Sequence, residues 1–442
     1  MKKKTVLIVD GGGRAAALAQ KYSESKFVGR ILVVPGNDLI KLNVEKTLKI
    51  YPALKTTSIK EIIRIAKKEK VDLVDVAQDN AIEQGLVDEL KKYKIDVIGP
   101  TRNAGQIEWD KAWSRDFMTR HKIPHPSYKI FRSAKKGIAY LRSHKNSRWF
   151  VKAFGLTYGR GVYPAENNKD AEGRISQLKQ FGTSGRTFLI EECLKGEEFS
   201  SFALSDGKNF VILGHAQDNK RLLNNDEGLN TGGIGASSPP LVINPKLERQ
   251  IIEIFKKAID GLEKENREYI GVLYLGGMVL NSKVFVIEFN SRWGDPEVAV
   301  VLPAIKNDLF ELSMSAIQGK IHKIKIRVDD KSRVLVTACA KGYFDLTEIR
   351  GKQIFGLENV IKISGVTIYG SGTKKIGDKY YVSGSRIFHI VGEGKSVLKA
   401  REKTYAAMSL LYIEGNNLHY RTDIGWRDLE RFNNDKIKLK KL

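Results

Sequence analysis

The sequence predicts a protein of mixed α/β and α+β class in three parts. These are a parallel α/β domain at the N-terminus, a mixed central region and a small β-rich region at the C-terminus. Three observations support this. Apolar strands alternate with helices over the first hundred residues, glycine-rich turns separate strands from about residue 128, and strands dominate again after about residue 330. A chain of 442 residues, 42% of them hydrophobic, is long enough for roughly three domains.

The N-terminal alternation predicts a βαβ arrangement. The expected strands are residues 5–9, 30–34, 71–76 and 96–98, and the expected helices are residues 14–22, 59–70 and 82–93. This order indicates a parallel sheet with helices on both faces. Ligands of such sheets bind at the carboxyl ends of the strands, which here fall at residues 11–14, 35–38, 77–80 and 99–101.

A helical bridge at residues 104–121 leads into the central region. Its expected strands are residues 150–154, 187–192, 199–204 and 210–217, and its expected helices are residues 170–181, 245–264 and 309–318. In the C-terminal region we expect strands at residues 333–340, 365–369, 380–383 and 386–391, and then a helix near residues 396–412. Strands separated by glycine-rich turns and single helices are typical of α+β architecture.

The charge balance is strongly basic. Lysine and arginine number 75 against 51 acidic residues, which gives a formal net charge of +24. The basic residues are spread along the whole chain, and the sequence holds no RNP-like aromatic motif, zinc-finger spacing or arginine-rich arm. We therefore expect a lysine-rich, solvated surface that also attracts anionic substrates, and no nucleic-acid partner.

Cysteine content and hydropathy indicate a cytoplasmic protein. Cys193 and Cys339 are too few for a disulfide framework or a cysteine-rich zinc site. The apolar run at residues 6–9 ends at Asp10, which is shorter than the hydrophobic region of a signal peptide. No segment approaches the roughly 20 apolar residues of a membrane span, so we expect no membrane partner.

The segment at residues 147–163 reads as a strand, a glycine-rich loop and a second strand. Lys152 lies near the end of the first strand, and Gly155, Gly159 and Gly161 follow it. Glycines allow the backbone to direct N–H groups at a phosphate, and the lysine would neutralise its charge. The segment lacks the Walker A pattern. By itself it fits a phosphate-binding loop and a plain β-hairpin equally well.

The segment at residues 284–297 carries the strongest chemical signal. In a regular strand, Glu288 and Asn290 share one face, and we expect this face to be the one that carries Val284 and Val286. A carboxylate and an amide oxygen at the end of an apolar strand suit Mg²⁺ that bridges phosphates. Arg292 places a guanidinium beside that metal, and a turn with two further acids follows. The alternative is a polar strand end with a surface turn.

Two further segments carry weaker signals. Charged residues at 217–221 and Asp226 precede a glycine-rich loop at residues 228–235, which indicates a substrate lid, an anion-binding turn or a mobile surface loop. Residues 191–198 follow a strand and suit a hinge whose backbone meets adenine while Glu198 takes ribose hydroxyls. Spacing alone does not choose among these alternatives.

Taken together and in this order, the segments resemble the ATP-grasp ligases, and among them the phosphoribosylamine–glycine ligase (glycinamide ribonucleotide synthetase) family. The similarity runs from Gly11 to Arg427. The pattern Glu-Phe-Asn-x-Arg-x-Gly-Asp-Pro-Glu at residues 288–297 is close to diagnostic. The other segments that carry it are residues 12–14, 35–37, 99–101, 110–111, 152–161, 191–198, 217–221, 230–235 and 423–427.

The resemblance implies domain boundaries and a nucleotide site. An N-terminal domain would span residues 1–103, the ATP-grasp domain residues 104–325 with a nucleotide-covering subdomain at 126–192, and a C-terminal domain with a basic tail residues 326–442. The implied cofactors are ATP and Mg²⁺ or Mn²⁺, with Glu288 and Asn290 on the metal. The residues implied for the nucleotide are Lys111, Lys152, Gly159, Arg160, Gly161, Glu191, Glu192, Leu194, Glu198 and Lys220.

The resemblance also implies a reaction. The carboxylate of glycine attacks the γ-phosphorus of ATP, and the amine of phosphoribosylamine then displaces phosphate from glycyl phosphate. The implied catalytic residues are Arg292, Asp218, Lys152, Asp295 and Glu297. The residues implied for the substrates are Gly12, Gly13, Arg14, Gln78, Asp79, Asn230, Thr231, Gly232 and Gly233.

The sequence departs from the family pattern mainly on the acceptor side. The family usually reads Gly-Gly-Arg-Glu-His-Ala, but Arg14 is followed here by three alanines. The usual Gly-Pro-Glu after the third strand is replaced by residues 77–80, and Arg160 and Ile234 stand for the usual lysine and methionine. Either Gln78 and Asp79 rebuild the acceptor pocket, or the acceptor is not phosphoribosylamine.

Three other interpretations compete. The departures around Ala15 and Ala77 favour an ATP-grasp ligase with another amine acceptor. A nicotinamide-dependent dehydrogenase would use Gly11, Gly13 and Ala16 as its fingerprint, but the second strand runs into Pro35 instead of an acidic residue that could bind ribose. A non-catalytic relative would not need Lys152, Glu288, Asn290 and Arg292. We expect a monomer or a homodimer.

Overall fold

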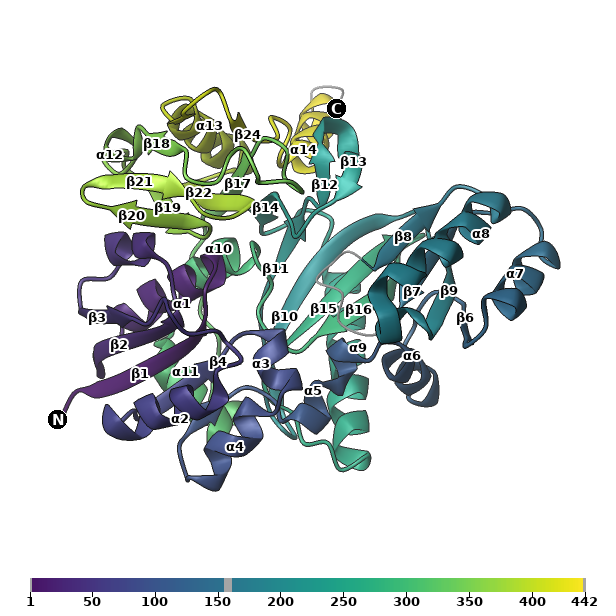
Figure 1. Ribbon diagram of the computed structural model, residues 1–442, viewed down its shortest axis with the longest axis horizontal. Helices are drawn as coiled ribbons and strands as arrows, with labels where there is room; N and C mark the ends of the chain where they lie inside the picture. Colours follow the sequence, from purple (N-terminus) through teal and green to yellow (C-terminus); the bar gives the residue numbers. More distant parts are fainter. Residues whose placement is uncertain (1, 155–160, 440–442) are drawn as a thin grey trace.

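The computed structural model describes residues 2–154 and 161–439 (Figure 1). The N-terminal domain is a five-stranded parallel sheet in the order β3-β2-β1-β4-β5. Its strands are β1 (Lys4–Asp10), β2 (Val28–Pro35), β3 (Thr47–Ile50), β4 (Leu73–Val76) and β5 (Val97–Ile98). Its helices are α1 (Gly13–Ser23), α2 (Ile59–Lys68), α3 (Asp79–Glu83) and α4 (Leu86–Lys92). The parallel α/β prediction is confirmed.

Strand β1 lies at the centre of this sheet and is buried on both faces. Val6 and Ile8 pack into one hydrophobic cluster, whereas Leu7 and Val9 pack into another on the opposite face. A central strand of a parallel sheet needs apolar residues at every position because helices cover both sides. The single helix expected at residues 82–93 is instead two helices, because Gly85 adopts a left-handed conformation with φ of +81° between them.

The bridge into the central region is also two helices, α5 (Arg102–Trp109) and α6 (Lys111–Arg120). Asp110 separates them and caps α6, since its side chain accepts a hydrogen bond from the Trp113 N–H at 2.8 Å. A subdomain with its own core follows: the sheet β6-β9-β7-β8 packs against α7 (Ala134–Arg142) and α8 (Asn168–Gln177). Its strands are β6 (Tyr128–Phe131), β7 (Trp149–Ala153), β8 (Val162–Ala165) and β9 (Phe188–Glu192).

The largest sheet has nine strands and passes from the central region into the C-terminal region (Figure 1). Its order is β16-β15-β10-β11-β14-β17-β22-β19, and β24 also pairs with β17. The central strands are β10 (Glu197–Asp206), β11 (Phe210–Asp218), β14 (Gly235–Ser238), β15 (Ile270–Leu280) and β16 (Lys283–Asn290). The C-terminal strands are β17 (Ser332–Ala340), β19 (Val366–Gly370), β22 (Arg386–Gly394) and β24 (Leu418–His419).

Shorter elements complete the fold. A hairpin of β12 (Arg221–Leu223) and β13 (Glu227–Asn230) follows β11, and a second C-terminal sheet has the order β20-β21-β18-β23. Its strands are β18 (Gln353–Phe355), β20 (Thr373–Ile376), β21 (Lys379–Val382) and β23 (Tyr412–Ile413). The remaining α-helices are α9 (Pro245–Lys264), α10 (Val298–Val301), α11 (Leu309–Ile317), α12 (Leu357–Val360), α13 (Val397–Met408) and α14 (Trp426–Leu439). Among the described residues, no helix has both the length and the apolar character needed to cross a membrane.

Candidate active site

A buried ion cluster joins the small subdomain to α6. Lys152 of β7 contacts the carboxylate of Glu191 on β9, and Arg115 Nη2 of α6 lies 2.6 Å from Glu191 Oε2. Glu191 is 1% exposed and Lys152 is 6% exposed. Burial by itself raises the pKa of Glu191, but the charges of Arg115 and Lys152 outweigh it and lower the pKa. The lysine expected to seek an anion is therefore held in place by a carboxylate.

The strand that carries Glu288 and Asn290 contains a β-bulge. Gly277 pairs with Val286 and Gly276 pairs with Glu288, so Ile287 has no partner residue across this ladder. The extra residue reverses the alternation, as bulges do. Val284 and Val286 therefore share a core cluster with Phe289.

The two polar side chains consequently point to the opposite face. The prediction that Glu288 and Asn290 share the face of Val284 and Val286 was wrong, because strand alternation holds only without a bulge. The prediction that the two polar residues point together is supported by the regular pairing from Glu288 to Asn290. Gly276 leaves the space for this arrangement, since a Cβ there would lie 3.1 Å from Glu288 Cγ.

Positive charges converge on Glu288. Lys220 Nζ lies 3.8 Å from Glu288 Oε1 and 3.6 Å from Glu198 Oε2. Burial alone raises the pKa of Glu288, but the charges of Lys220, Lys152 and Lys111 lower it to about 2. The Glu288 side chain is still 42% exposed. An ionised and accessible carboxylate surrounded by lysines is the arrangement that a polyanion with a bound cation requires.

The donor set fits a divalent metal shared with a ligand. Glu288 and Asn290 offer a carboxylate and an amide oxygen at one strand end, and the amide oxygen keeps a second lone pair beside the hydrogen bond that it accepts from Arg292. Within residues 2–154 and 161–439, no group of three or more His, Cys, Asp or Glu residues could hold a metal. An ion at this site would need the rest of its ligands from phosphates and water, which Mg²⁺ accepts readily.

Arg292 is fixed by an acidic partner that the sequence did not single out. Its Nη2 lies 2.8 Å from Glu108 Oε1, and it also donates to Asn290 Oδ1 at 3.2 Å. Glu108 Oε2 accepts hydrogen bonds from the N–H and the hydroxyl of Ser291 at 2.8 and 2.7 Å. Glu108 lies on the buried face of α5, where an acidic residue is rare unless it has a partner. An acid at a core-facing helix position was the sequence feature that could have identified it.

A second carboxylate pair lies next to Lys220. Glu297 Oε1 accepts hydrogen bonds from Tyr274 at 2.7 Å and Ser200 at 3.0 Å. Asp218 Oδ1 is buried and has no hydrogen-bond partner. Burial and the nearby charge of Glu297 raise the pKa of Asp218 well above its usual value. Tyr274 and Ser200 carried no motif in the sequence, since Tyr274 lies in an apolar strand and Ser200 is one of several serines in β10.

The start of α1 forms a network around Asp10. Asp10 Oδ1 accepts hydrogen bonds from the N–H groups of Gly12 and Ala15, and its Oδ2 accepts from Arg14 Nη1 at 2.7 Å. The same Arg14 nitrogen donates to Ala77 O at 2.6 Å and to Gln78 Oε1 at 2.8 Å.

Gln78 in turn donates to Asp79 Oδ1 at 2.9 Å. The two residues that depart from the family pattern therefore join Arg14 in one network. Asp79 also acts on Arg292, whose pKa is raised by Glu108 and then Asp79 against the opposing effect of burial. The acceptor-side departures and the Arg292 site are thus electrostatically linked.

The glycine-rich loop after β13 is anchored at several points. Thr231 donates through both its N–H and its hydroxyl to Lys220 O, at 2.7 and 2.8 Å. Gly232 N–H donates to the Tyr343 hydroxyl at 3.0 Å. Asn230 pairs with Arg221 across the hairpin. The loop therefore sits directly against the segment that carries Asp218 and Lys220.

The remaining nucleotide-side residues lie between β7 and β10. Glu192 is exposed and accepts a hydrogen bond from Ser127 at 2.7 Å, and Leu194 is half-buried. Gly161 O accepts from Ala153 N–H at 2.8 Å at the mouth of the loop. Gly159 and Arg160 lie outside the described residues.

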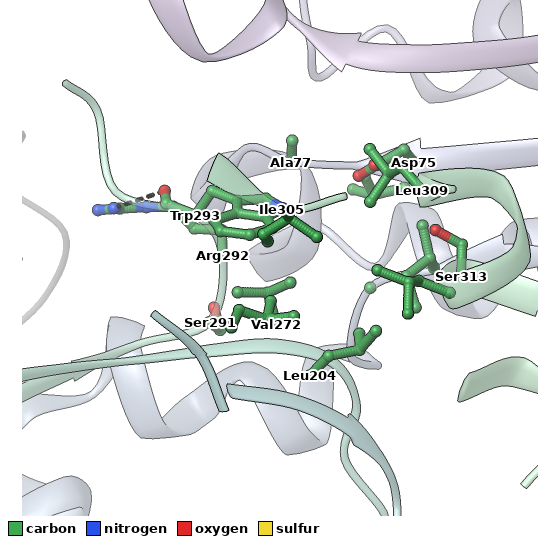
Figure 2. A pocket seen from close by; sticks show the side chains of 15 residues that line it. Asp75, Ala77, Leu204, Val272, Ser291, Arg292, Trp293, Ile305, Leu309 and Ser313 are labelled. Carbon is green, nitrogen blue, oxygen red and sulfur yellow. Dashed lines mark hydrogen bonds between the residues drawn. The ribbon is translucent and has the colours of Figure 1, made fainter. Parts of the chain in front are cut away.

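A small cavity of ≈20 Å³ lies behind the site, between the N-terminal sheet and α11. Figure 2 shows Arg292 and Ser313 at opposite ends of it, with Trp293 and Ile305 on its wall. At one end, Tyr22 donates to Asp75 Oδ2 at 2.9 Å and lies 3.1 Å from Ser313 Oγ. This volume accommodates about one water molecule, so the cavity is too small for a substrate.

The fold and the site together define an ATP-grasp ligase: a small subdomain carries a buried lysine over a strand that ends in a carboxylate and an amide. Comparison with known protein families supports this class and identifies the family. Models of the phosphoribosylglycinamide synthetase N domain, ATP-grasp (A) domain and C domain match residues 4–108, 109–298 and 333–427. The chain belongs to the phosphoribosylglycinamide synthetase family, and the resemblance read from the sequence is confirmed.

Relatives match along the whole chain. A phosphoribosylamine–glycine ligase from Caulobacter vibrioides is 34% identical over 435 residues, covering 98% of this chain and all of the relative. The enzyme of that name from Escherichia coli K12 is 35% identical over 435 residues, covering 97% of this chain and all of the relative.

Solved structures share the fold. The crystal structure of a phosphoribosylamine–glycine ligase from Thermotoga maritima has a TM-score of 0.80 and 26% identity, covering 95% of this chain and all of that one. A biotin carboxylase from Campylobacter jejuni has a TM-score of 0.72 at 18% identity, covering 94% of this chain and 93% of that one, which shows a common fold alone.

Proposed function

We propose that the chain joins glycine to 5-phosphoribosylamine in de novo purine biosynthesis, and forms glycinamide ribonucleotide, ADP and phosphate. The observation that carries the ATP-dependent chemistry is the strand-end carboxylate of Glu288, with Lys220 Nζ 3.8 Å away and with the charges of Lys152 and Lys111 also lowering its pKa. The choice of substrates is supported by full-length similarity to relatives that bear this enzyme's name.

ATP binds between the small subdomain and the nine-stranded sheet in this proposal. Lys111 and Lys152 neutralise its phosphates, and the family resemblance also assigns Gly159, Arg160 and Gly161 to the nucleotide. Glu191 holds Lys152 in place, because both of its oxygens are paired with buried cations. Adenine and ribose are contacted by Glu192, Leu194, Glu198 and Lys220.

Glu288 and Asn290 would hold a divalent ion, Mg²⁺ or Mn²⁺. When bound, this ion would neutralise negative charge on the phosphates of ATP. Lys220 lies 3.6 Å from Glu198 and 3.8 Å from Glu288 and orients both carboxylates, and its charge lowers the pKa of Glu288. The protein thereby places the γ-phosphorus at a fixed position before the reaction begins.

The first chemical step activates glycine. A carboxylate oxygen of glycine attacks the γ-phosphorus, the bond from that phosphorus to the ADP oxygen breaks, and glycyl phosphate forms. Arg292 stabilises the negative charge on the transferring group. Its guanidinium is already oriented by Glu108 at 2.8 Å, so it does not have to reorganise during the reaction.

The second step transfers the glycyl group. The amine nitrogen attacks the carbonyl carbon, the bond from that carbon to the phosphate oxygen breaks, and the leaving phosphate takes up the proton that the nitrogen loses. Asp218 contacts the reacting amine, since its Oδ1 is buried without a partner. Glu297 and Asp295 orient the site around it: Glu297 is held by Tyr274 and Ser200, and Asp295 by basic side chains.

The phosphoribosyl part lies at the N-terminus of α1, beside Asn230, Thr231, Gly232 and Gly233. Gly13 offers a backbone N–H group at a helix start, which favours an anion, and Gly12 lies beside it with its own N–H donated to Asp10 Oδ1. Arg14 is held by Asp10, Ala77 O and Gln78, and Gln78 is held by Asp79. This network also favours a second candidate function: ligation of glycine to a different amine, in a pocket rebuilt by Gln78 and Asp79.

One assay tests both candidates. We expect ADP release that requires glycine, phosphoribosylamine and Mg²⁺ together. ADP release that depends on glycine and another amine, and not on phosphoribosylamine, would support the second candidate. No ADP release with any amine in an acceptor screen would contradict both. The proposed setting is the cytoplasm, with the chain as a monomer or homodimer and with neither nucleic acid nor membrane as partner.

A further inference from the structure

Asp295 is the point at which all three parts of the chain meet. Its Oδ2 lies 2.7 Å from Arg386 Nη2, and its Oδ1 lies 3.3 Å from His389 Nε2. Arg386 Nη1 also donates to the Asp295 carbonyl at 2.6 Å. The Asp295 side chain is only 8% exposed and His389 is fully buried. Arg386 therefore binds Asp295 through its carboxylate and its carbonyl, and the imidazole of His389 packs against the other carboxylate oxygen without a hydrogen bond.

A β-bulge makes this double contact possible. Arg386 and His389 are three residues apart on β22, and in a regular strand they would face opposite sides. Cys339 pairs with Arg386 and Ala338 pairs with Phe388, so Ile387 has no partner across this ladder. The extra residue brings both side chains to the same face. Bulges that re-aim side chains are frequent beside active sites.

Arg386 also holds the glycine-rich loop. Its Nη1 donates to Gly232 O at 2.7 Å and to Gly233 O at 3.3 Å. One guanidinium thus binds the loop and the Asp295 turn together. His389 is oriented from behind by Thr337, whose hydroxyl lies 2.9 Å from His389 Nδ1.

The same pair sets the position of α1. A Cβ at Gly13 would lie 2.2 Å from His389 Cδ2 and 3.0 Å from Asp295 Oδ1, so the first turn of α1 packs directly against the pair. On the other side, a Cβ at Gly233 would lie 2.8 Å from Asp218 Oδ1. The contact of Asp295 with Arg386 and His389 therefore sets the distance between the start of α1 and the loop beside Asp218. We call this contact the Asp295 anchor.

We propose that Arg386 and His389 are positioning residues for the acceptor amine: through Asp295, the C-terminal domain fixes the distance between the start of α1 and the loop at Gly232 and Gly233. This inference rests on the proposed function, in which these two segments bind the phosphoribosyl amine. The nucleotide side is held by other contacts, those of Lys152 with Glu191 and of Lys220 with Glu288. Loosening the Asp295 anchor should therefore weaken binding of the acceptor amine and leave binding of ATP unchanged.

The test is a comparison of Michaelis constants in Arg386→Lys. A single ammonium cannot reproduce a guanidinium that serves three carbonyls and a carboxylate. We expect the KM for phosphoribosylamine to rise about tenfold or more and the KM for ATP to stay within about twofold of wild type. Arg333→Lys is the matched control, because Arg333 is a buried arginine of the same sheet that pairs with Asp329 and Glu393. It should leave the KM for phosphoribosylamine within about twofold.

A rise of both Michaelis constants in parallel, or of neither, would overturn the inference. If Arg386→Lys does not fold, as judged by its thermal unfolding, His389→Gln replaces it in the same comparison, with the same expected and contradicting results. Wild-type enzyme that releases no ADP with phosphoribosylamine would instead contradict the proposed function, which keeps the two failures distinct.

Discussion

Arg292 Nη2 lies 2.8 Å from Glu108 Oε1, so a carboxylate from α5 holds the guanidinium that we place on the transferring phosphoryl group. The other oxygen of Glu108 binds the backbone and the hydroxyl of Ser291. Glu108 therefore fixes both the side chain of Arg292 and the backbone just before it. Such an arrangement orients the arginine before any substrate arrives.

Replacing Glu108 by Gln should destabilise the protein and lower its turnover. The substitution keeps the size of the side chain but leaves the Arg292 charge without its counterion in a buried setting. Loss of one partner from a buried pair costs about 3 kcal/mol in the free energy of unfolding, which urea titration measures. Glu265→Gln is the control, since Glu265 pairs with Arg120 at the surface and should cost less than about 1 kcal/mol. Equal losses in the two variants would contradict the role of Glu108.

Arg292→Lys should lower kcat by about 100-fold. Lysine keeps the positive charge but cannot contact Glu108 and a phosphoryl oxygen in a fixed plane. Glycine-dependent ADP release at saturating substrates gives the measurement. Arg120→Lys is a suitable control because Arg120 makes a two-point contact with Glu265 and has no role in the proposed site. Unchanged kcat in Arg292→Lys would remove this arginine from the mechanism.

Glu288→Gln should reduce turnover more than about 100-fold, because the metal loses its only anionic protein ligand in the proposed site. With a pKa of about 2, Glu288 is ionised throughout the physiological pH range, so the effect should not depend on pH between about 6 and 9. Glu263→Gln serves as control, since Glu263 is similarly exposed and lies 3.6 Å from Lys208. Near-normal activity of Glu288→Gln at any Mg²⁺ concentration would show that the metal binds elsewhere.

Asp75→Asn should change how stability depends on pH. Burial raises the pKa of Asp75 from 3.8 to about 7, so between these values the folded chain binds more protons at this site than the unfolded chain. The contribution of this group to the free energy of unfolding therefore falls as pH rises from about 4 to about 7, and is level above that. Asn keeps an acceptor for Tyr22 and cannot ionise.

Relative to wild type, Asp75→Asn should accordingly be more stable at about pH 8 than at about pH 4. The difference in the free energy of unfolding between the variant and wild type should rise by up to roughly 4 kcal/mol over this range. Urea unfolding at several pH values measures this difference. A difference between the two proteins that does not vary with pH would show that Asp75 ionises as easily in the folded chain as in the unfolded one.

The sequence indicated the three parts of the fold and the chemistry at residues 288–297, because periodicity and the order of motifs are local properties. It missed the direction of Glu288 relative to Val286, because the bulge at Ile287 exists only through pairing with β15. The same limit applies to Arg386 and His389, whose shared face depends on pairing with β17.

The sequence also could not predict hydrogen-bond partners that come from distant segments of the chain. Glu108 meets Ser291 across 183 positions, and Tyr274 and Ser200 meet at Glu297 because β10 and β15 pair. These residues are far apart in the sequence and form no short motif. Their function becomes visible only when the fold shows which buried polar groups they satisfy.

The pairing of β14 with β17 has a consequence for dissecting this chain into pieces. Cutting the chain near residue 331 would strip β14 of one neighbour and leave a row of unpaired backbone donors and acceptors on a strand that is buried along its whole length. Such an unprotected edge strand tends to pair with strands of other copies of the chain. The ATP-grasp part made alone should therefore precipitate, whereas the two pieces produced together should recover a soluble, active complex.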